Sequence, residues 1–187
     1  MNEIPAELVR SAMDGDAAAF ERIYRLSSGF VYTVALRVLG NAADAEDLTQ
    51  EVFVKVHASL GSFAFRSSFK TWLYRVTMNM TINAYHRKSR DARRRADLDE
   101  ASAAASCEGG QRRELASDEA GRALGALLGR LTAEHRAVIV LRELEGLSYE
   151  EMSAALGINI NTVRTRLRRA REALMAHGGK EVIGHAM

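Results

Sequence analysis

The chain has 187 residues, of which 47% are hydrophobic and 27% charged, with one proline and 14 glycines. This composition is typical of a folded helical protein and excludes disorder throughout. The start, MNEIPAELVR, lacks a signal-peptide pattern, and no apolar run approaches the roughly 20 residues that a bilayer needs, so we expect a cytoplasmic protein without membrane insertion.

The formal net charge is +2, but the charges are distributed in two basic blocks and one acidic block. Residues 66–95 hold nine Lys or Arg against one Asp, residues 97–119 hold two Arg against seven acids, and residues 161–172 hold five Arg against one Glu. Two basic blocks separated by an acidic one predict two surfaces that face an anion and a connector that does not.

The first part of the chain reads as consecutive helices. Asp16 is suited to cap a helix that begins AAAFERIYRL, and the apolar pattern resumes over residues 30–39 after a break at 27–29. The next helix starts at Asn41 or Asp44, and its apolar residues recur every four positions. The recurring residues are Leu48, Val52, Val56 and Leu60, and the opposite face carries Asp47, Gln50, Glu51 and Lys55.

An aromatic loop and a basic helix follow. GSFAFRSS interrupts the helical period, and FKTWLYRVTMNMTINAYHRKSR then reads as a long helix that turns basic at its end. Aromatic rings beside cations suit the unstacked bases of a single nucleic-acid strand. We expect Phe69 and Trp72 in the core, and the loop residues Phe63 and Phe65 to be more open.

Residues 96–118 have the composition of a linker, with small and polar side chains and a Gly109-Gly110 pair. The boundary divides the chain into a domain of residues 1–95, a second domain of residues 119–178 and a tail of residues 179–187. Neither alternating strands nor a nucleotide-binding glycine loop is present. The predicted fold is therefore all-α, with two small helical domains joined by a flexible linker.

The second domain contains the pattern of a helix-turn-helix. Ser148 and Glu151 have the spacing of a capping box, which marks a helix start. Gly157 can take a left-handed conformation after the helix end, and a second helix begins at Ile160 or Asn161. A short helix, a tight turn with Gly and a second helix with a basic face are typical of a DNA-binding helix-turn-helix.

A helical wheel divides this second helix into two sides. One side packs inward, and the other side and its flanks suit the base edges and phosphates of a duplex. The alternative to DNA binding is a solvent-exposed arginine face that is partly paired to Glu172 and has no ligand. The inward residues are Val163, Leu167, Ala170 and Leu174; the base-edge candidates are Asn161, Thr165, Arg168 and Arg169; the phosphate candidates are Arg164, Arg166 and Arg171.

DAEDLTQEVFVKV, SSFKTWLYRVTMN and GLSYEEMSAALGININTVRTRLRRAREAL, in this order, resemble an extracytoplasmic-function (ECF) sigma factor of bacterial RNA polymerase. The resemblance covers nearly the whole chain apart from the linker and the tail. It implies three partners: core RNA polymerase, through the clamp helices of its largest subunit and the flap of its second-largest; promoter DNA; and an anti-sigma factor.

The resemblance also implies roles for individual residues. The exposed side of the acidic helix, Asp47, Gln50, Glu51 and Lys55, matches the segment that docks on the clamp helices. The loop and basic helix match the segment that holds the melted minus-ten element, with candidates Phe63, Phe65, Arg66, Ser67, Asn79, Asn83, Arg87, Lys88 and Arg90. The second helix of the helix-turn-helix matches the segment that contacts the minus-thirty-five element, with candidates Asn161, Thr162, Arg164, Thr165, Arg166, Arg168, Arg169 and Arg171.

One position departs from the family pattern. The family has a Gly two residues after the first Phe of the loop, where this chain has Phe65 in FAFRSSF. A Phe takes a positive φ only at an energetic cost, so we expect the loop to adopt another shape.

Two other classes of protein, an enzyme and a two-domain transcription regulator, fit the sequence less well. An enzyme is poorly supported, because the five histidines are scattered, none has metal-ligand spacing with Cys107, and no nucleophile pattern stands out. We therefore expect no catalytic residue, metal or cofactor. A two-domain transcription regulator with an N-terminal sensing domain explains the helix-turn-helix equally well, but not the basic, aromatic block of residues 62–94.

Overall fold

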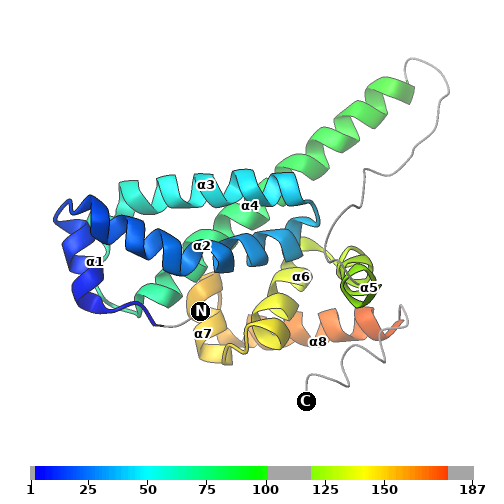
Figure 1. The fold of residues 1–187 in the computed structure, drawn as a ribbon. Helices are drawn as coiled ribbons and strands as arrows, with labels where there is room; N and C mark the ends of the chain where they lie inside the picture. The colour runs from blue at the N-terminus through cyan, green and yellow to red at the C-terminus, as the bar shows by residue number, and fades with distance from the viewer. Residues whose placement is uncertain (1–2, 101–118, 177–187) are drawn as a thin grey trace.

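The computed structural model describes residues 3–100 and 119–176, and every regular element in these two ranges is a helix (Figure 1). The all-α prediction is confirmed. Most of the predicted linker, with Cys107, and the tail after residue 176 lie outside the described residues. The elements are α1 (Ala6–Met13), α2 (Ala17–Leu39), α3 (Ala42–Ser59), the 3-10 turn η1 (Leu60–Ser62), α4 (Phe69–Glu100), α5 (Glu119–Leu128), α6 (Ala133–Ile139), the π-helical turn η2 (Val140–Leu144), α7 (Tyr149–Leu156) and α8 (Ile160–Ala176).

The starts of α2 and α3 follow the predicted caps. Asp16 Oδ1 accepts the backbone N–H groups of Ala18 and Ala19 at 2.9 and 3.1 Å, and Asn41 Oδ1 accepts that of Asp44 at 3.0 Å. Each side chain satisfies a backbone donor that has no partner within its own helix.

The expected break at residues 27–29 is wrong, because α2 runs through it without interruption. Ser27 is fully buried, and its hydroxyl donates to the carbonyl of Ile23 at 2.5 Å. Six residues further on, the Thr33 hydroxyl donates to the carbonyl of Gly29 at 2.7 Å. Small polar residues are compatible with a helix interior when their hydroxyls bond the preceding turn in this way.

Helix α4 is longer than the sequence predicted. It begins after Ser68, whose Oγ accepts the backbone N–H of Thr71 at 3.1 Å, and it continues to Glu100, into the first residues of the predicted linker. Its C-terminal end projects beyond the other helices (Figure 1). The last turns of α4 therefore lie beyond the packed helices.

Two hydrophobic clusters form the core, and one of them joins the two predicted domains. The first cluster lies among α1, α2, α3 and the start of α4. The second cluster includes Val34 and Val38 of α2 and Tyr74 and Met78 of α4, packed with buried residues of α5, α6, η2, α7 and α8. Burying this shared apolar surface favours a closed arrangement in which the C-terminal helices pack on α2 and α4.

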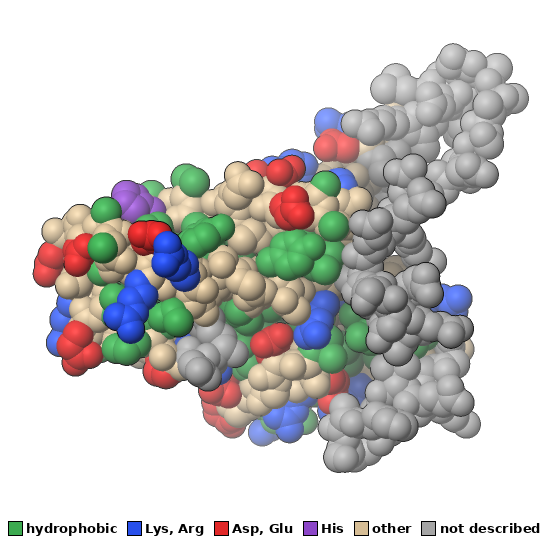
Figure 2. Space-filling view, viewed as in Figure 1, with side chains coloured by type: hydrophobic (Ala, Val, Ile, Leu, Met, Phe, Trp, Pro, Cys, Tyr) green, Lys and Arg blue, Asp and Glu red, His purple; other side chains and the backbone are tan. Residues whose placement is uncertain are grey.

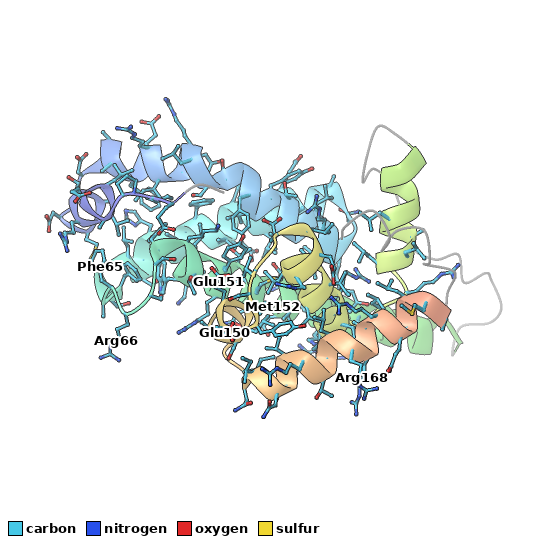
Figure 3. All side chains as sticks on the ribbon, turned by 90° about the horizontal axis from the view of Figure 1, so that it is seen from below. Phe65, Arg66, Glu150, Glu151, Met152 and Arg168 are labelled. Carbon is cyan, nitrogen blue, oxygen red and sulfur yellow. The ribbon has the colours of Figure 1, made fainter. Side chains whose placement is uncertain are left out.

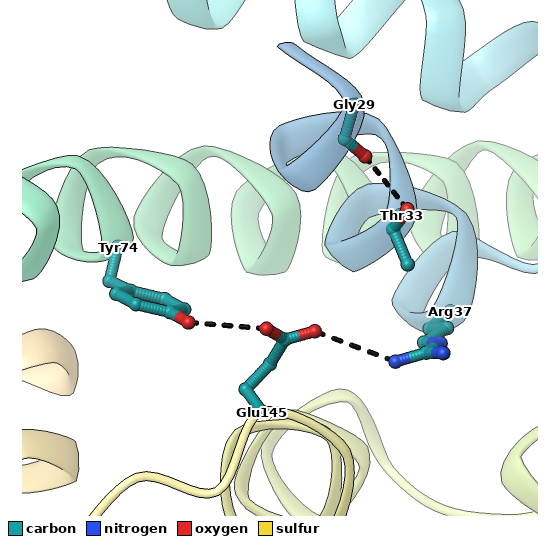
Figure 4. Close-up of polar contacts among 5 residues, drawn as sticks. All are labelled: Gly29, Thr33, Arg37, Tyr74 and Glu145. Carbon is teal, nitrogen blue, oxygen red and sulfur yellow. Dashed lines mark hydrogen bonds and ion pairs between the residues drawn. The ribbon is translucent and has the colours of Figure 1, made fainter. Parts of the chain in front are cut away.

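A largely buried carboxylate connects the two parts at this contact (Figure 4). Glu145, at the end of η2, accepts a hydrogen bond from the Tyr74 hydroxyl at 3.2 Å and lies 3.5 Å from the Arg37 guanidinium. Burial, together with the adjacent Glu145 carboxylate, raises the pKa of the Tyr74 hydroxyl above its usual range. Tyr74 therefore remains a donor across the physiological range.

Further polar contacts cross the same boundary. The Arg136 guanidinium of α6, 4% exposed, donates to the carbonyl of Val38 near the end of α2. Arg75 Nε of α4 donates to the carbonyl of Ala154 in α7 at 3.1 Å. His86 Nε2 and Glu134 Oε1 lie 2.9 Å apart. Partial burial alone would raise the pKa of the Glu134 carboxyl, but backbone and His86 hydrogen bonds outweigh it and lower that pKa.

Candidate functional site

The helix-turn-helix has the geometry that the sequence predicted. Ser148 Oγ accepts the N–H of Glu151 at 3.1 Å, and Glu151 Oε2 accepts the N–H of Ser148 at 2.8 Å, so the capping box is complete. Gly157 ends α7 with φ 65°. Asn159 Oδ1 then accepts the N–H of Asn161 at 2.8 Å at the start of α8. These local bonds set the turn that fixes α8 against α7.

Ser148→Ala should lower the free energy of unfolding by about 1 kcal/mol, because the first turn of α7 loses a side-chain acceptor. The measurement is urea unfolding followed by circular dichroism. Ser28→Ala, in the middle of α2, is the matched control and should cost less, because Ala favours a helix interior. An equal loss in both variants would contradict the role assigned to the capping box.

Helix α8 is divided as the wheel predicted. The four inward residues are buried, and the N-terminal and outer positions are exposed. Figure 3 shows Arg168 on the side of α8 that faces away from the other helices. The buried residues are Val163, Leu167, Ala170 and Leu174; the exposed candidates are Asn161, Thr162, Arg164, Thr165, Arg168 and Arg169; Arg166 and Arg171 are half-buried.

The arginines of α8 differ in their contacts. Arg168 lies 2.5 Å from Glu172, but both side chains are more than half exposed, so this pair contributes little. Arg164 lies over the Tyr149 ring, 5.9 Å from its centroid. Arg171 donates to Glu143 Oε1 of η2 at 2.6 and 3.0 Å, and thereby attaches α8 to η2. Glu143 could not be recognised from the sequence, because nothing local pairs it with a residue 28 positions away.

The predicted polymerase-binding residues lie together on α3. Leu48, Val52 and Val56 are buried as the period predicted, and the four candidates are all exposed. Figure 2 shows acidic and hydrophobic side chains interspersed over the face that α2 and α3 form. The candidates are Asp47, Gln50, Glu51 and Lys55.

A shallow groove adjoins these residues between α2 and α3, with a volume of about 380 Å³. Its lining is largely apolar and aromatic, and Val54, in the middle of the face, is 71% exposed. Exposed apolar groups rimmed by charge are typical of a surface that binds protein. Sequence reasoning missed this part of the surface, although Val54 interrupts an otherwise polar side of α3 and could have indicated it. The lining residues are Phe20, Tyr24, Gln50, Phe53, Val54 and His57.

The loop between η1 and α4 differs from expectation in the burial of Phe63 and in the backbone of Phe65, whereas the exposure of Phe65 is as predicted. Phe63 is only 5% exposed, so the prediction that it is open is wrong: its ring packs against those of Phe69 and Trp72, with centroids 5.8 and 5.3 Å away. Phe69 is buried as predicted, and Trp72 is half-buried against the same cluster. Phe65 is 38% exposed and takes φ 52°, so this residue itself adopts the left-handed conformation that we expected the loop to avoid.

The basic side of α4 continues from this loop. Arg66 is exposed and points away from the body (Figure 3), and Ser67 is half-buried. Lys88 forms an ion pair with Asp44 at the start of α3. The other α4 candidates, all exposed, are Asn79, Asn83, Arg87 and Arg90.

None of the helices in the described part of the chain is long and apolar enough to span a bilayer. Within residues 3–100 and 119–176, no group of three or more His, Cys, Asp or Glu is arranged to hold a metal ion.

Comparison with protein families matches both parts of the chain. Residues 23–91 match the family described as sigma-70 region 2, and residues 121–174 match sigma-70 region 4. The first match contains most of α2, all of α3, the loop, and α4 as far as residue 91. The second contains the helix-turn-helix.

Individual relatives agree with these matches. The chain is 38% identical to the ECF RNA polymerase sigma factor SigE of Mycolicibacterium smegmatis over 86% of its length, and spans 63% of that relative. It is 31% identical to the ECF RNA polymerase sigma factor SigW of Bacillus subtilis, over 89% of this chain and 92% of SigW. Among solved structures, it resembles the sigma factor RpoE of Bartonella quintana in complex with the anti-sigma factor NepR, with TM-score 0.62 and 26% identity over 84% of this chain and 94% of RpoE. The chain therefore belongs to the ECF sigma factors of RNA polymerase, with sigma-70 regions 2 and 4 on its N-terminal and C-terminal helices.

Proposed function

We propose that this sigma factor joins core RNA polymerase through the exposed face of α3. Four polar residues, exposed together beside an apolar groove, support this assignment. On such a surface, the charged groups can steer the approaching partner, and the exposed apolar groups can be buried when the complex forms. The complex then acts in the cytoplasm, and the sigma factor contributes promoter choice to it but no catalytic group.

We further propose that α8 reads the minus-thirty-five duplex. The observation that carries this assignment is the outer face of α8, with two adjacent arginines, Arg168 and Arg169, exposed beyond a complete capping box and turn. Arginine side chains can bond guanine O6 and N7 in the major groove, and neighbouring basic residues can bond phosphates. Because Arg171 is held by Glu143, Arg164 and Arg166 are the better phosphate candidates.

The loop between η1 and α4, together with exposed polar and basic residues of α4, is proposed to hold the melted minus-ten strand. Asn79, Asn83, Arg87 and Arg90 are exposed along one continuous helix that leaves the packed body. A cationic groove or helix beside exposed aromatic rings suits a single strand.

An anti-sigma factor is the third proposed partner, because a solved relative was captured with one. The alternative of an N-terminal sensing domain has lost its support, because residues 23–91 match sigma-70 region 2.

The experiment that tests the proposal is transcription in vitro with core polymerase and a library of promoters randomised at both elements. Core polymerase with the chain should initiate from a defined subset of the library, whereas core polymerase alone should not. Binding of the free chain to promoter duplex should be weak, because each DNA surface is small and the two act together within one complex. Tight binding to duplex as a symmetric dimer, without effect on initiation, would contradict the proposal and favour an operator-binding regulator.

Arg169→Ala should reduce initiation by an amount equivalent to about 1–3 kcal/mol and relax the preference at one position of the upstream element, because a base-edge contact is lost. Arg164→Ala is the comparison and should weaken all promoters alike, because a phosphate contact carries no sequence information. Both are read from the same library by sequencing the transcripts. Identical effects of the two changes on sequence preference would contradict the division of α8 into base and phosphate contacts.

A further inference from the structure

Lys88 differs from the other basic candidates on α4, because a carboxylate already holds it. Its Nζ forms an ion pair with Asp44 Oδ2, in the first turn of α3. Arg87 and Arg90, its exposed neighbours, form no ion pair with any residue that the structure describes. A nucleic-acid strand that binds α4 therefore competes with Asp44 for Lys88, but meets no such competitor at Arg87 or Arg90.

The two partners of this ion pair differ in how firmly they are placed. Asn41 Oδ1 accepts the backbone N–H of Asp44 at 3.0 Å, and a negative charge is stabilised at a helix N-terminus. The Asp44 side chain is 27% exposed and that of Lys88 is 60% exposed. A lysine ammonium sits on a flexible four-carbon stem. The carboxylate is thus the fixed partner, and the ammonium is the one that can leave.

Asp44 also belongs to the proposed docking face of α3. Asp44, Asp47 and Glu51 are spaced by three and four residues, so they lie on one side of the helix. These three carboxylates outnumber Lys55, the one cation among the docking candidates, so a complementary partner presents basic groups. Side chains three residues apart have Cβ atoms only about 5–6 Å apart. A cation that approaches Asp47 therefore comes within reach of Asp44.

We propose that Asp44 holds Lys88 in the free sigma factor, and that a cation of docked core polymerase replaces Lys88 at Asp44, so that Lys88 is released to bind a phosphate of the melted strand. The inference rests on the proposed functions of α3 and α4, and it makes the DNA surface depend on the docking surface. The dependence is reciprocal: a strand that takes Lys88 leaves Asp44 open to the polymerase, and each ligand raises the affinity for the other by the same factor.

The expected size of the effect follows from the kind of contact. An exposed ion pair changes an equilibrium constant by roughly 2- to 5-fold. The released ammonium forms a charge-assisted bond with a phosphate instead. Each phosphate contact on a single strand adds about 0.7 to the slope of log affinity against log salt. The salt slope therefore counts the contact itself, whereas a general change of charge or stability moves the affinity alone.

The first measurement uses the full chain without polymerase and a labelled single-stranded oligonucleotide at low salt, where binding to a polyanion is strongest. Asp44→Asn should raise the affinity roughly 2- to 5-fold and steepen the slope by about 0.7, because one more phosphate contact forms. Addition of Lys88→Ala should cancel both changes. Glu46→Gln, which removes the same charge from an exposed residue of α3, is the matched control and should leave the slope unchanged.

The second measurement repeats the titrations with core polymerase saturated by each variant. Asp44→Asn should then leave the slope unchanged, because Lys88 is already released, and Lys88→Ala should lower it by about 0.7. Arg87→Ala, which removes a cation without a carboxylate partner, should lower the slope equally in the free chain and in the complex. Lys88→Ala should also tighten binding to core polymerase roughly 2- to 5-fold, and this gain should be absent in the Asp44→Asn background.

The outcomes distinguish this inference from the proposed function. An unchanged slope for Asp44→Asn in the free chain, or equal effects of Lys88→Ala on the slope in the free chain and the complex, overturns the inference alone. Failure of the wild-type chain to join core polymerase overturns the proposed function, and the free-chain slopes still decide whether Asp44 holds Lys88. Asp44→Glu retains the charge and should keep the wild-type slope, and thermal denaturation shows whether any variant has lost its fold.

Discussion

Glu145→Ala should lower the free energy of unfolding by about 2–4 kcal/mol and loosen the closed arrangement of the two sigma regions. The carboxylate is 12% exposed and is the shared partner of Tyr74 and Arg37. Its removal leaves a buried hydroxyl without this acceptor and a partly buried guanidinium without this counter-charge, and both are costly. Urea unfolding measures the first effect, and the radius of gyration from small-angle X-ray scattering measures the second.

Two further variants test whether the expected effect is specific to the Glu145 carboxylate. Glu145→Gln retains an acceptor for Tyr74 but not the charge opposite Arg37, and should cost about 1 kcal/mol. Glu143→Ala breaks the ion pair to Arg171, which lies wholly within the C-terminal helices, so it should destabilise the chain without increasing its radius of gyration. If Glu145→Ala and Glu143→Ala expand the chain equally, Glu145 has no special part in holding the regions together.

Asp47→Lys should weaken binding to core RNA polymerase by about 100-fold, equivalent to about 3 kcal/mol, and so abolish transcription at ordinary concentrations. Asp47 is exposed on α3, at the N-terminal end of the proposed docking face, so a reversed charge places a cation where an acidic side chain is proposed to meet the partner. The measurement is co-purification with core polymerase, followed by a titration with labelled sigma factor.

The matched control is Glu7→Lys, which makes the same change of charge at an exposed position of a different helix, α1. It should bind core polymerase as the wild type does. Both variants should retain the wild-type melting temperature within a few degrees, because surface substitutions change stability little. Normal co-purification of Asp47→Lys would show that α3 is not the docking surface.

The closed arrangement bears on how the two DNA surfaces are presented. The outer face of α8 and the basic residues Arg87, Lys88 and Arg90 of α4 are exposed while α7 remains packed on α4. Neither surface has to be uncovered within the described residues before it can meet DNA. The packing of the C-terminal helices on α2 and α4 fixes the relative position of the two DNA surfaces, because the shared core and the Glu145 contacts hold α8 and α4 in one unit.

Much of this protein could be predicted from short stretches of its sequence. The caps at Asp16 and Ser148, the left-handed Gly157 and the two sides of α8 all appear in the structure as predicted, and of the two starts considered for α3 the structure has Asn41. Each depends on residues no more than a few positions apart, because capping bonds and helical periodicity are local. The assignment of α3 and α8 to partners stays a prediction, but the exposure on which it depends was foreseeable for the same reason.

Other features depend on contacts between distant residues, and only the tertiary structure decided them. Tyr74 and Arg37 meet Glu145 across 71 and 108 positions, and no local pattern pairs them. Phe63 is buried because the start of α4 places Phe69 and Trp72 around it, and the same closure forces Phe65 into its left-handed conformation. Local sequence thus determined the helices and their polar faces, whereas packing determined which faces are covered, because burial depends on all elements that meet at one place.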